Sequence, residues 1–362
     1  MDQDQWDQDG GIRLREHRPE DAAALAEAYE DPVFRRFARS DTGPSAGHVI
    51  ADEQTDRMLG GIGLSAAAPG RGQAEVTFWV APWARRRGVA TAALRAFDRY
   101  AFGSGLERLE LLIHWDNPAA QRVAMAAGYT REGVRRGALP ATDGGRQDML
   151  VFTRLAGDPR EPAARLLPDL PGDELTDGVV TLRRLGEQDI DFYTELHNVP
   201  DVIDTSVPPE PKPADEIHRR CVRTESHWLA GDRADLVILD AATGTRAGEI
   251  GLYYQEPPLA QAMIGYSMLP AFRGRGFATR AAQLLALWTF AETSIVRLIA
   301  GALPTNIGSQ RVLEKAGFRK EAYQRLRLPG KDGARVDDVQ FVLLAGDLLA
   351  QASSQDGSHR ET

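Results

Sequence analysis

The chain has 362 residues, enough for two domains of ordinary size, and 43% hydrophobic and 26% charged residues are typical of a globular protein. Its net charge of −9 argues against a general nucleic-acid or anionic-membrane binder, because a phosphate surface attracts a basic face. The single cysteine, Cys221, excludes an intrachain disulfide and a cysteine-rich metal site, and we expect it to be a small buried side chain.

Targeting signals are not evident in the sequence. No apolar run approaches the roughly 18 residues that a membrane span needs. The acidic start, MDQDQWDQDGG, differs from the basic and then apolar pattern of a signal peptide. We therefore expect a cytoplasmic protein that binds neither membrane nor nucleic acid and holds no metal.

The predicted elements follow one order along the first part of the chain. A short strand begins at Ile12, and a helix with an acidic start covers residues 20–29. Two or three strands follow, and a strand at 75–82 leads into an arginine-rich turn and a helix. A strand at 107–114, a helix opened by Asn117 and a closing strand pair complete the order.

The same order returns in the second part of the chain. APWARRRGVATAA at 81–93 resembles LPAFRGRGFATRA at 269–281, and NPAAQRVAMAAGY at 117–129 resembles NIGSQRVLEKAGF at 306–318. Such a repeat predicts two similar domains, each a mixed α/β sheet flanked by helices. We place the first domain at 12–156, a Pro-rich acidic linker at 157–176, the second domain at 177–350 and a disordered tail at 351–362.

Each arginine-rich turn lies where a strand ends and a helix begins. The helix start offers unpaired backbone N–H groups and a positive dipole end, and glycine permits close approach of a ligand. A solvated basic turn is the alternative, but two copies of Arg-x-x-Gly-x-Ala favour a pyrophosphate cradle. The predicted cradle residues are Arg85, Arg86, Arg87, Gly88, Val89, Ala90 and Thr91, with Arg273, Gly274, Arg275, Gly276, Phe277, Ala278 and Thr279.

These motifs together resemble the GNAT superfamily of acyl-CoA-dependent N-acyltransferases. YTREG at 129–133 and FRKEA at 318–322, each followed by Gly-x-x-x-Asp, resemble the branch that acetylates N-terminal amines of ribosomal proteins. The resemblance implies two tandem GNAT-like domains, each a mixed, mostly antiparallel and splayed sheet flanked by helices. It also implies acetyl-CoA as co-substrate, with its pantetheine arm between the splayed strands.

The resemblance assigns further residues to the acyl-CoA arm. Val80 and Met268 would offer backbone groups to it, and Asn117 and Asn306 would lie near its far end. A plain helix N-cap is the alternative role of both asparagines, and the two roles are compatible.

The two copies differ at the positions where the resemblance implies chemistry. A serine three residues after the motif asparagine would assist the leaving thiolate, and only the second copy has it, as Ser309; the first has Ala120. Ser309 could instead only cap its helix. The second copy also has 20 extra residues, including a predicted amphipathic helix within 212–231 that would form an acceptor wall. We therefore expect catalysis in the second domain and acyl-CoA binding alone in the first.

The general base is less well defined by the sequence. Glu249, whose counterpart is Gly61, is one candidate, and Asp337 of the Gly-x-x-x-Asp pattern is another. A surface carboxylate is the alternative for Glu249, and the chain has His114, His218 and His227 as weaker candidates. Leu139 and Leu328 stand where some relatives have a glutamate, which puts a ribosomal-protein acceptor in doubt.

Three functions remain open from the sequence. The favoured one is transfer of an acetyl group from acetyl-CoA to a primary amine, on a small molecule or a protein N-terminus. The second is an acyl-CoA-binding sensor or scaffold in which one or both domains are non-catalytic. The third is a transfer reaction that uses aminoacyl-tRNA, which the acidic charge disfavours. The expected assembly is a monomer with paired domains or a homodimer.

Overall fold

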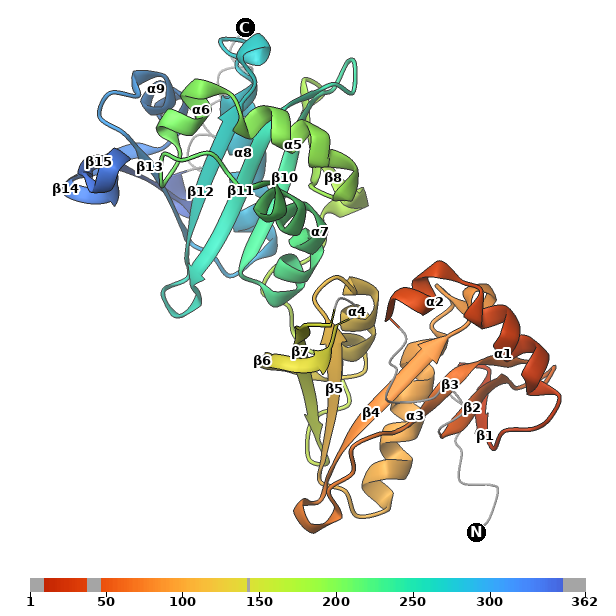
Figure 1. Ribbon diagram of the computed structural model, residues 1–362. Coiled ribbons are helices and arrows are strands. Elements are labelled where there is room, and N and C mark those ends of the chain that lie inside the picture. The colour runs from red at the N-terminus through yellow and green to blue at the C-terminus, as the bar shows by residue number, and fades with distance from the viewer. Residues whose placement is uncertain (1–9, 38–46, 142–143, 348–362) are drawn as a thin grey trace, which may run out of the picture. The chain divides into compact units, whose positions relative to one another are not determined.

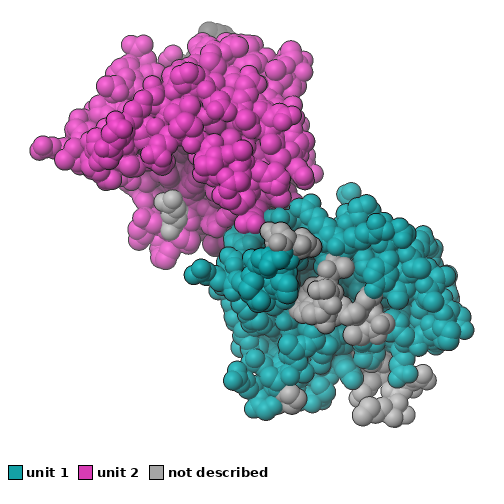
Figure 2. All heavy atoms as spheres, viewed as in Figure 1, with its two compact units in different colours: residues 1–164 teal, residues 165–362 magenta. Residues whose placement is uncertain are grey.

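The computed structural model describes residues 10–37, 47–141 and 144–347, so the predicted tail at 351–362 lies outside the described residues. The chain divides into two compact units, residues 1–164 and 165–362 (Figure 2). The boundary falls inside the predicted linker. Leu167 and Leu170 are buried in the core of the second unit, and the indole N–H of Trp228 donates to the carbonyl of Pro168 at 2.8 Å.

The first unit is a mixed sheet whose described strands run in the order β1-β2-β3-β4-β5-β7-β6 (Figure 1). The strands are β1 Ile12–Arg15, β2 His48–Asp52, β3 Met58–Leu64, β4 Gln73–Val80, β5 Arg108–His114, β6 Thr130–Pro140 and β7 Arg146–Leu155. The helices are α1 Asp21–Tyr29, α2 Pro32–Phe37, α3 Val89–Gly103 and α4 Pro118–Ala126.

The second unit repeats this sheet, with the described strands in the order β14-β15-β13-β12-β11-β10-β9-β8. The strands are β8 Glu174–Thr176, β9 Val180–Arg184, β10 Arg233–Asp240, β11 Arg246–Glu256, β12 Gln261–Met268, β13 Arg297–Ala302, β14 Arg319–Pro329 and β15 Arg335–Leu344. The helices are α5 Ile190–His197, α6 Pro200–Thr205, α7 Ala214–Ala230, α8 Phe277–Glu292 and α9 Ile307–Lys315. The predicted amphipathic helix is α7.

Both sheets open in the middle. In the first unit, β4 and β5 pair in parallel only from Gln73↔Arg108 to Glu75↔Glu110. In the second unit, β12 and β13 pair in parallel only from Gln261↔Arg297 to Met263↔Ile299. The other strand pairs are antiparallel within the described residues. The predicted mostly antiparallel, splayed sheet is therefore confirmed in each unit.

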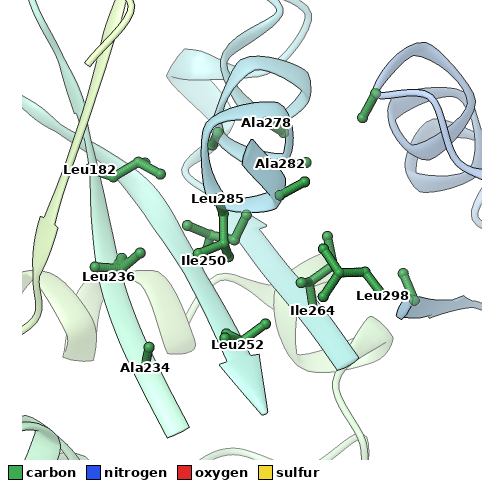
Figure 3. Packing of buried hydrophobic residues seen from close by; sticks show 14 of the residues in the cluster. Leu182, Ala234, Leu236, Ile250, Leu252, Ile264, Ala278, Ala282, Leu285 and Leu298 are labelled. Atoms are coloured by element: carbon green, nitrogen blue, oxygen red, sulfur yellow. The ribbon is translucent and has the colours of Figure 1, made fainter. Parts of the chain in front are cut away.

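Alternating side chains of the second sheet pack against helices on opposite faces. Leu236 of β10 and Ile250 of β11 lie under Leu285 of α8 in one core (Figure 3). The neighbouring β10 residue, Val237, points the other way and packs with Cys221 of α7. Because consecutive strand residues face opposite sides, α8 and the α5–α7 pair cover different faces of the sheet.

A buried ion pair fixes the first helix of each unit to the first long strand. Arg15 of β1 contacts Asp21 at the start of α1 at 2.7 Å, and Arg183 of β9 contacts Asp189 before α5 at 2.7 Å. The carboxylates are 7% and 0% exposed, so removing one partner would leave a buried charge. This pairing positions α1 and α5 over the face of the sheet opposite α3 and α8.

Candidate functional site

The turn between the splayed strand and the following helix has the same backbone in both units. Gly88 caps α3 with φ +78°, and Gly276 caps α8 with φ +81°. This left-handed conformation favours glycine. A Cβ placed at either residue would meet nothing within 4 Å, so the space in front of both helix starts is open. Both turns thus combine a left-handed glycine with open space at a helix start, and their role as pyrophosphate cradles stays a prediction.

A second left-handed residue precedes each capping glycine by two positions. Gly274 has φ +71° in the second unit, and Arg86 has φ +60° in the first. An arginine in this region carries a backbone cost of about 1 kcal/mol or more. Strain of this kind persists only where the surrounding structure holds it.

The first arginine of each turn is engaged within its own unit. Arg85 donates to the carbonyl of Val80 at 3.3 Å and to Asp31, which precedes α2, at 2.6 Å. Arg273 donates to the carbonyl of Met268 at 3.0 Å and also pairs with Asp201 of α6. Each arginine therefore ties the end of the splayed strand to the short helix, and it orders the loop on which a ligand would lie.

The third position of the turn carries the more exposed guanidinium. Arg87 approaches Asp52 only at 4.0 Å, and its side chain is 56% exposed. Arg275 donates to Asp240 at 3.0 Å and lies over the ring of Phe277, with 4.6 Å between guanidinium carbon and ring centre. These two arginines remain accessible to a phosphate group in solution.

Both motif asparagines cap the helix that follows the second splayed strand. Oδ1 of Asn117 accepts the N–H of Ala120 at 3.1 Å, and Oδ1 of Asn306 accepts the N–H of Ser309 at 3.0 Å. The predicted N-cap role is confirmed. A role toward the acyl-CoA arm stays a prediction.

Ser309 meets a tyrosine across the splay of the second unit. Oγ of Ser309 lies 2.9 Å from the hydroxyl of Tyr266 on β12, and that hydroxyl also donates to the Ser309 carbonyl at 3.1 Å. Burial raises the pKa of Tyr266 to about 12, with the Ser309 contact acting in the opposite direction. The corresponding positions of the first unit are Phe78 and Ala120, neither of which has a hydroxyl.

Glu249 lies on β11, on the face covered by α5 and α7. Its Oε1 is 3.0 Å from Nε2 of His197, and the two side chains are 14% and 7% exposed. Burial alone would raise the pKa of Glu249, but contact with His197 and the charge of Arg220 lower it to about 2. The carboxylate is therefore ionised throughout the neutral range.

A buried guanidinium continues this polar cluster. Arg220 of α7 donates to Asp235 at 2.7 Å and to the hydroxyl of Tyr253 at 2.6 Å. Burial would lower the pKa of Arg220, but the Asp235 carboxylate raises it well above its usual value. The adjacent Cys221 is buried as expected, and burial raises its pKa to about 12, so this thiol is a packing group.

Asp337 occupies a different environment from Ser309 and Glu249. Its carboxylate accepts the hydroxyl of Tyr323 at 2.6 Å and the N–H of Leu326, which has φ +52°, at 2.7 Å. The Tyr323 hydrogen bond lowers the pKa of Asp337. Asp148 of the first unit accepts the N–H of Gly137 in the same way at 2.7 Å. Asp148 thus stabilises a bulge in the β6–β7 hairpin, and Asp337 stabilises the corresponding bulge in the β14–β15 hairpin.

The first unit contains a pocket of about 720 Å³ that passes through its splay. One part is lined by predicted cradle and arm residues, which are Val80, Arg85, Arg86, Gly88, Val89, Ala90, Thr91 and Asn117. The other part is lined by Phe34 and Phe37 of α2, Trp79 of β4 and the small Gly61. Nε1 of Trp79 is buried and has no acceptor among the described residues.

Two residues of the site were not identified from the sequence. His197 ends α5, one turn after Tyr193, and Tyr266 lies in the splayed strand just before the cradle. The i, i+4 spacing of Tyr193 and His197 was the signal in the sequence that could have identified His197.

Residues 10–37, 47–141 and 144–347 contain neither a cluster of three or more metal-ligating side chains nor a helix long and apolar enough to cross a membrane.

Comparison with known sequences finds similarity in both units. A family model described as an acetyltransferase (GNAT) domain matches residues 12–130 and 180–319. The probable N-acetyltransferase YjcK of Bacillus subtilis (strain 168) is 46% identical over 67 residues, 18% of this chain and 37% of the relative. The uncharacterized N-acetyltransferase YnaD of the same strain is 36% identical over 81 residues, 22% of this chain and 47% of the relative. The chain thus spans less than half the length of these curated relatives.

Comparison with solved structures finds matches that each cover about half of the chain. A probable acetyltransferase is 24% identical, with a TM-score of 0.44, over 49% of this chain and 99% of its own. The spermidine N-acetyltransferase of Vibrio cholerae, solved with CoA and spermine, is 19% identical, with a TM-score of 0.42, over 48% of this chain and 99% of its own. Because the family model matches in both units and covers more than half of the residues, the chain belongs to the acetyltransferase (GNAT) domain family.

Proposed function

We propose that the protein is an acetyl-CoA-dependent N-acetyltransferase that acetylates a primary amine, with catalysis in the second unit. The observation that carries the choice of unit is the difference between the two splays. The second has the Ser309 hydroxyl and the Glu249 carboxylate, whereas the first has Ala120 and Gly61 at these positions. The acceptor is a small-molecule amine or a protein N-terminus.

In this proposal the backbone and the turn arginines bind the co-substrate. The N–H groups at the start of α8 and the guanidinium of Arg275 hold the pyrophosphate, and the arm lies between β12 and β13. The open space in front of Gly276 supports this placement. The site then fixes the thioester carbonyl for attack, which removes much of the entropic cost of a two-molecule reaction.

The chemical step is direct attack of the neutral amine on the thioester carbonyl carbon. The new C–N bond forms, the C–S bond breaks, and its electron pair leaves with the sulfur. Ser309 donates a hydrogen bond to that sulfur as it gains charge. Glu249, with a pKa of about 2, holds no proton near neutral pH, so it attracts and orients the incoming amine while the excess proton passes to water.

The test is release of CoA from acetyl-CoA with three acceptors: a polyamine, an amino sugar and a peptide with a free N-terminus. Turnover should survive Gly88→Trp and be lost in Gly276→Trp, because each change fills one cradle. Gly172→Trp is the matched control, since Gly172 also has φ +62° with open space around it. Turnover that depends on Gly88 and not on Gly276 would assign catalysis to the first unit.

A second function is favoured for the first unit by its pocket. The part beyond the splay is apolar and aromatic, and the counterpart of Glu249 is Gly61, so the unit would bind acyl-CoA without transferring the acyl group. The unpaired indole N–H of Trp79 would donate to an acceptor on the bound ligand. Acyl-CoA binding to the Gly276→Trp protein without CoA release supports this assignment, and CoA release by that protein would contradict it.

A further inference from the structure

We propose that Tyr266 is a positioning residue for Ser309, and that the two hydroxyls act as one unit on the sulfur of the departing CoA. This inference rests on the proposed function of the second unit. It goes further because it assigns a role to a strand residue that lies outside the cradle and the asparagine motif.

The position of the hydroxyl pair connects the two sides of the splay. Met263 is the last β12 residue paired with β13, so Tyr266 lies in the diverging part of the strand. Ser309 lies in the first turn of α9, which follows β13. The 2.9 Å contact between their hydroxyl oxygens therefore joins one splayed strand to the helix after the other.

The 2.9 Å contact allows either hydroxyl to donate, and the phenol O–H also reaches the Ser309 carbonyl at 3.1 Å; the proposal assigns the phenol as the donor to Oγ when CoA is bound. Burial holds the pKa of Tyr266 at about 12, so the phenol keeps its proton near neutral pH and can donate it in a hydrogen bond. When Ser309 Oγ accepts this bond, its own hydrogen is free for a third group. A hydroxyl that accepts one hydrogen bond becomes a stronger donor in the next.

The first unit lacks both members of the pair. Phe78 keeps the aromatic ring and packs against the α3 core, while Ala120 keeps the helix and its cap. The ring and the helix start are thus retained without the hydroxyls. This comparison separates the packing role of the Tyr266 ring, which a phenylalanine can also fill, from the role of its hydroxyl group.

In the proposed acyl transfer, Tyr266 donates a hydrogen bond but keeps its proton. The amine nitrogen bonds to the carbonyl carbon, and the C–S electron pair goes to sulfur. Ser309 donates a hydrogen bond to the thiolate, and Tyr266 donates to Ser309 Oγ. The proton displaced from the amine passes through water and protonates the thiolate after release, which gives one amide and one free thiol.

The test measures the pKa of the CoA thiol on the full-length Gly88→Trp protein, by titration of the thiolate absorbance of bound CoA. A hydrogen bond to a charged group should lower this pKa by about one unit from the free value of about 8.5, a tenfold change. Tyr266→Phe, Ser309→Ala and the double variant should each reverse it to a similar extent, because the hydroxyls act together. With an amine acceptor, kcat should fall about tenfold in each while KM stays unchanged.

Tyr254→Phe is the matched control, because the hydroxyl of Tyr254 pairs with Ser294 Oγ at 3.2 Å away from the splay. It should leave the thiol pKa and kcat unchanged. If Tyr266→Phe behaves like Tyr254→Phe, the hydroxyl pair has no role, although the proposed function stands. If the Gly88→Trp protein binds no CoA while Gly172→Trp does, the proposed function of the second unit fails and the inference fails with it.

Discussion

The substitution Gly276→Trp should affect acyl-CoA affinity far more than it affects the stability of the second unit. Gly276 has φ +81°, and a residue with a Cβ pays about 1–2 kcal/mol for this conformation. Gly276→Trp should therefore lower the Tm of the second unit by roughly 2–8 °C. A Cβ at this position meets nothing within 4 Å, so this value comes from the backbone conformation.

The effect on acyl-CoA affinity should be much larger. An indole in front of α8 displaces the pyrophosphate from the helix start, which removes at least two charge-assisted hydrogen bonds. Each contributes about 1.5–3 kcal/mol, so the loss is about 3 kcal/mol or more, at least 100-fold in Kd. Gly172→Trp carries similar backbone strain at φ +62° and should retain full affinity.

Calorimetric titration of acetyl-CoA into the full-length protein measures both sites. We expect two binding events in the wild type, one after Gly276→Trp, and the other one after Gly88→Trp. Gly105→Trp, at the far end of α3, is the control for the first unit, because Gly105 also has a positive φ and open space around it. Wild-type binding in the Gly276→Trp protein would refute the cradle assignment in the second unit.

Three further predictions concern stability, pH and the helix caps. Arg154→Ala leaves the buried Asp98 carboxylate with the Tyr129 hydroxyl but without its charged partner at 2.8 Å, so urea unfolding of the first unit should show a loss of about 3–5 kcal/mol; an unchanged midpoint would contradict this. The lowered pKa of Glu249, about 2, means that its contribution to stability is present above pH about 4.5 and lost as the pH falls through about 2. Glu249→Gln should therefore flatten the acid unfolding curve in that window, and parallel curves would argue against it. Asn117→Ala and Asn306→Ala should each cost about 1 kcal/mol as caps in thermal unfolding, and a fall in CoA affinity would show a second role toward the arm.

Local sequence spacing was sufficient to predict the glycine turns and the caps. A strand end, a glycine and a helix start adjoin one another along the chain, so Gly276 and Asn306 are placed by their neighbours. The splay could be anticipated from the resemblance, and the parallel register that ends at Met263↔Ile299 confirms it. What the sequence predicted well is therefore what depends on a few adjacent residues.

The contacts that were missed join residues far apart in the chain. Arg273 reaches Asp201 across 72 positions, and Tyr266 reaches Ser309 across 43. Periodicity indicates that such side chains face the interior or the solvent, but tertiary packing chooses the partner. Glu249 could be named as a carboxylate on a strand, whereas its low pKa depends on a histidine from another element.

The two units share the features proposed to hold acyl-CoA and differ at the positions proposed to act on its acyl group. The positive-φ glycine, the arginine bound to a strand carbonyl and the asparagine cap are present in both. In the proposed function these features bind the ground state and the transition state alike through backbone groups and charges, and uniform binding does not raise kcat. The proposed reacting centre depends instead on side chains that differ between the units: Glu249 and Gly61, Tyr266 and Phe78, Ser309 and Ala120. An unchanged scaffold with an altered centre is what a catalytic unit beside a binding unit requires, and for that reason binding and turnover should be measured separately in each.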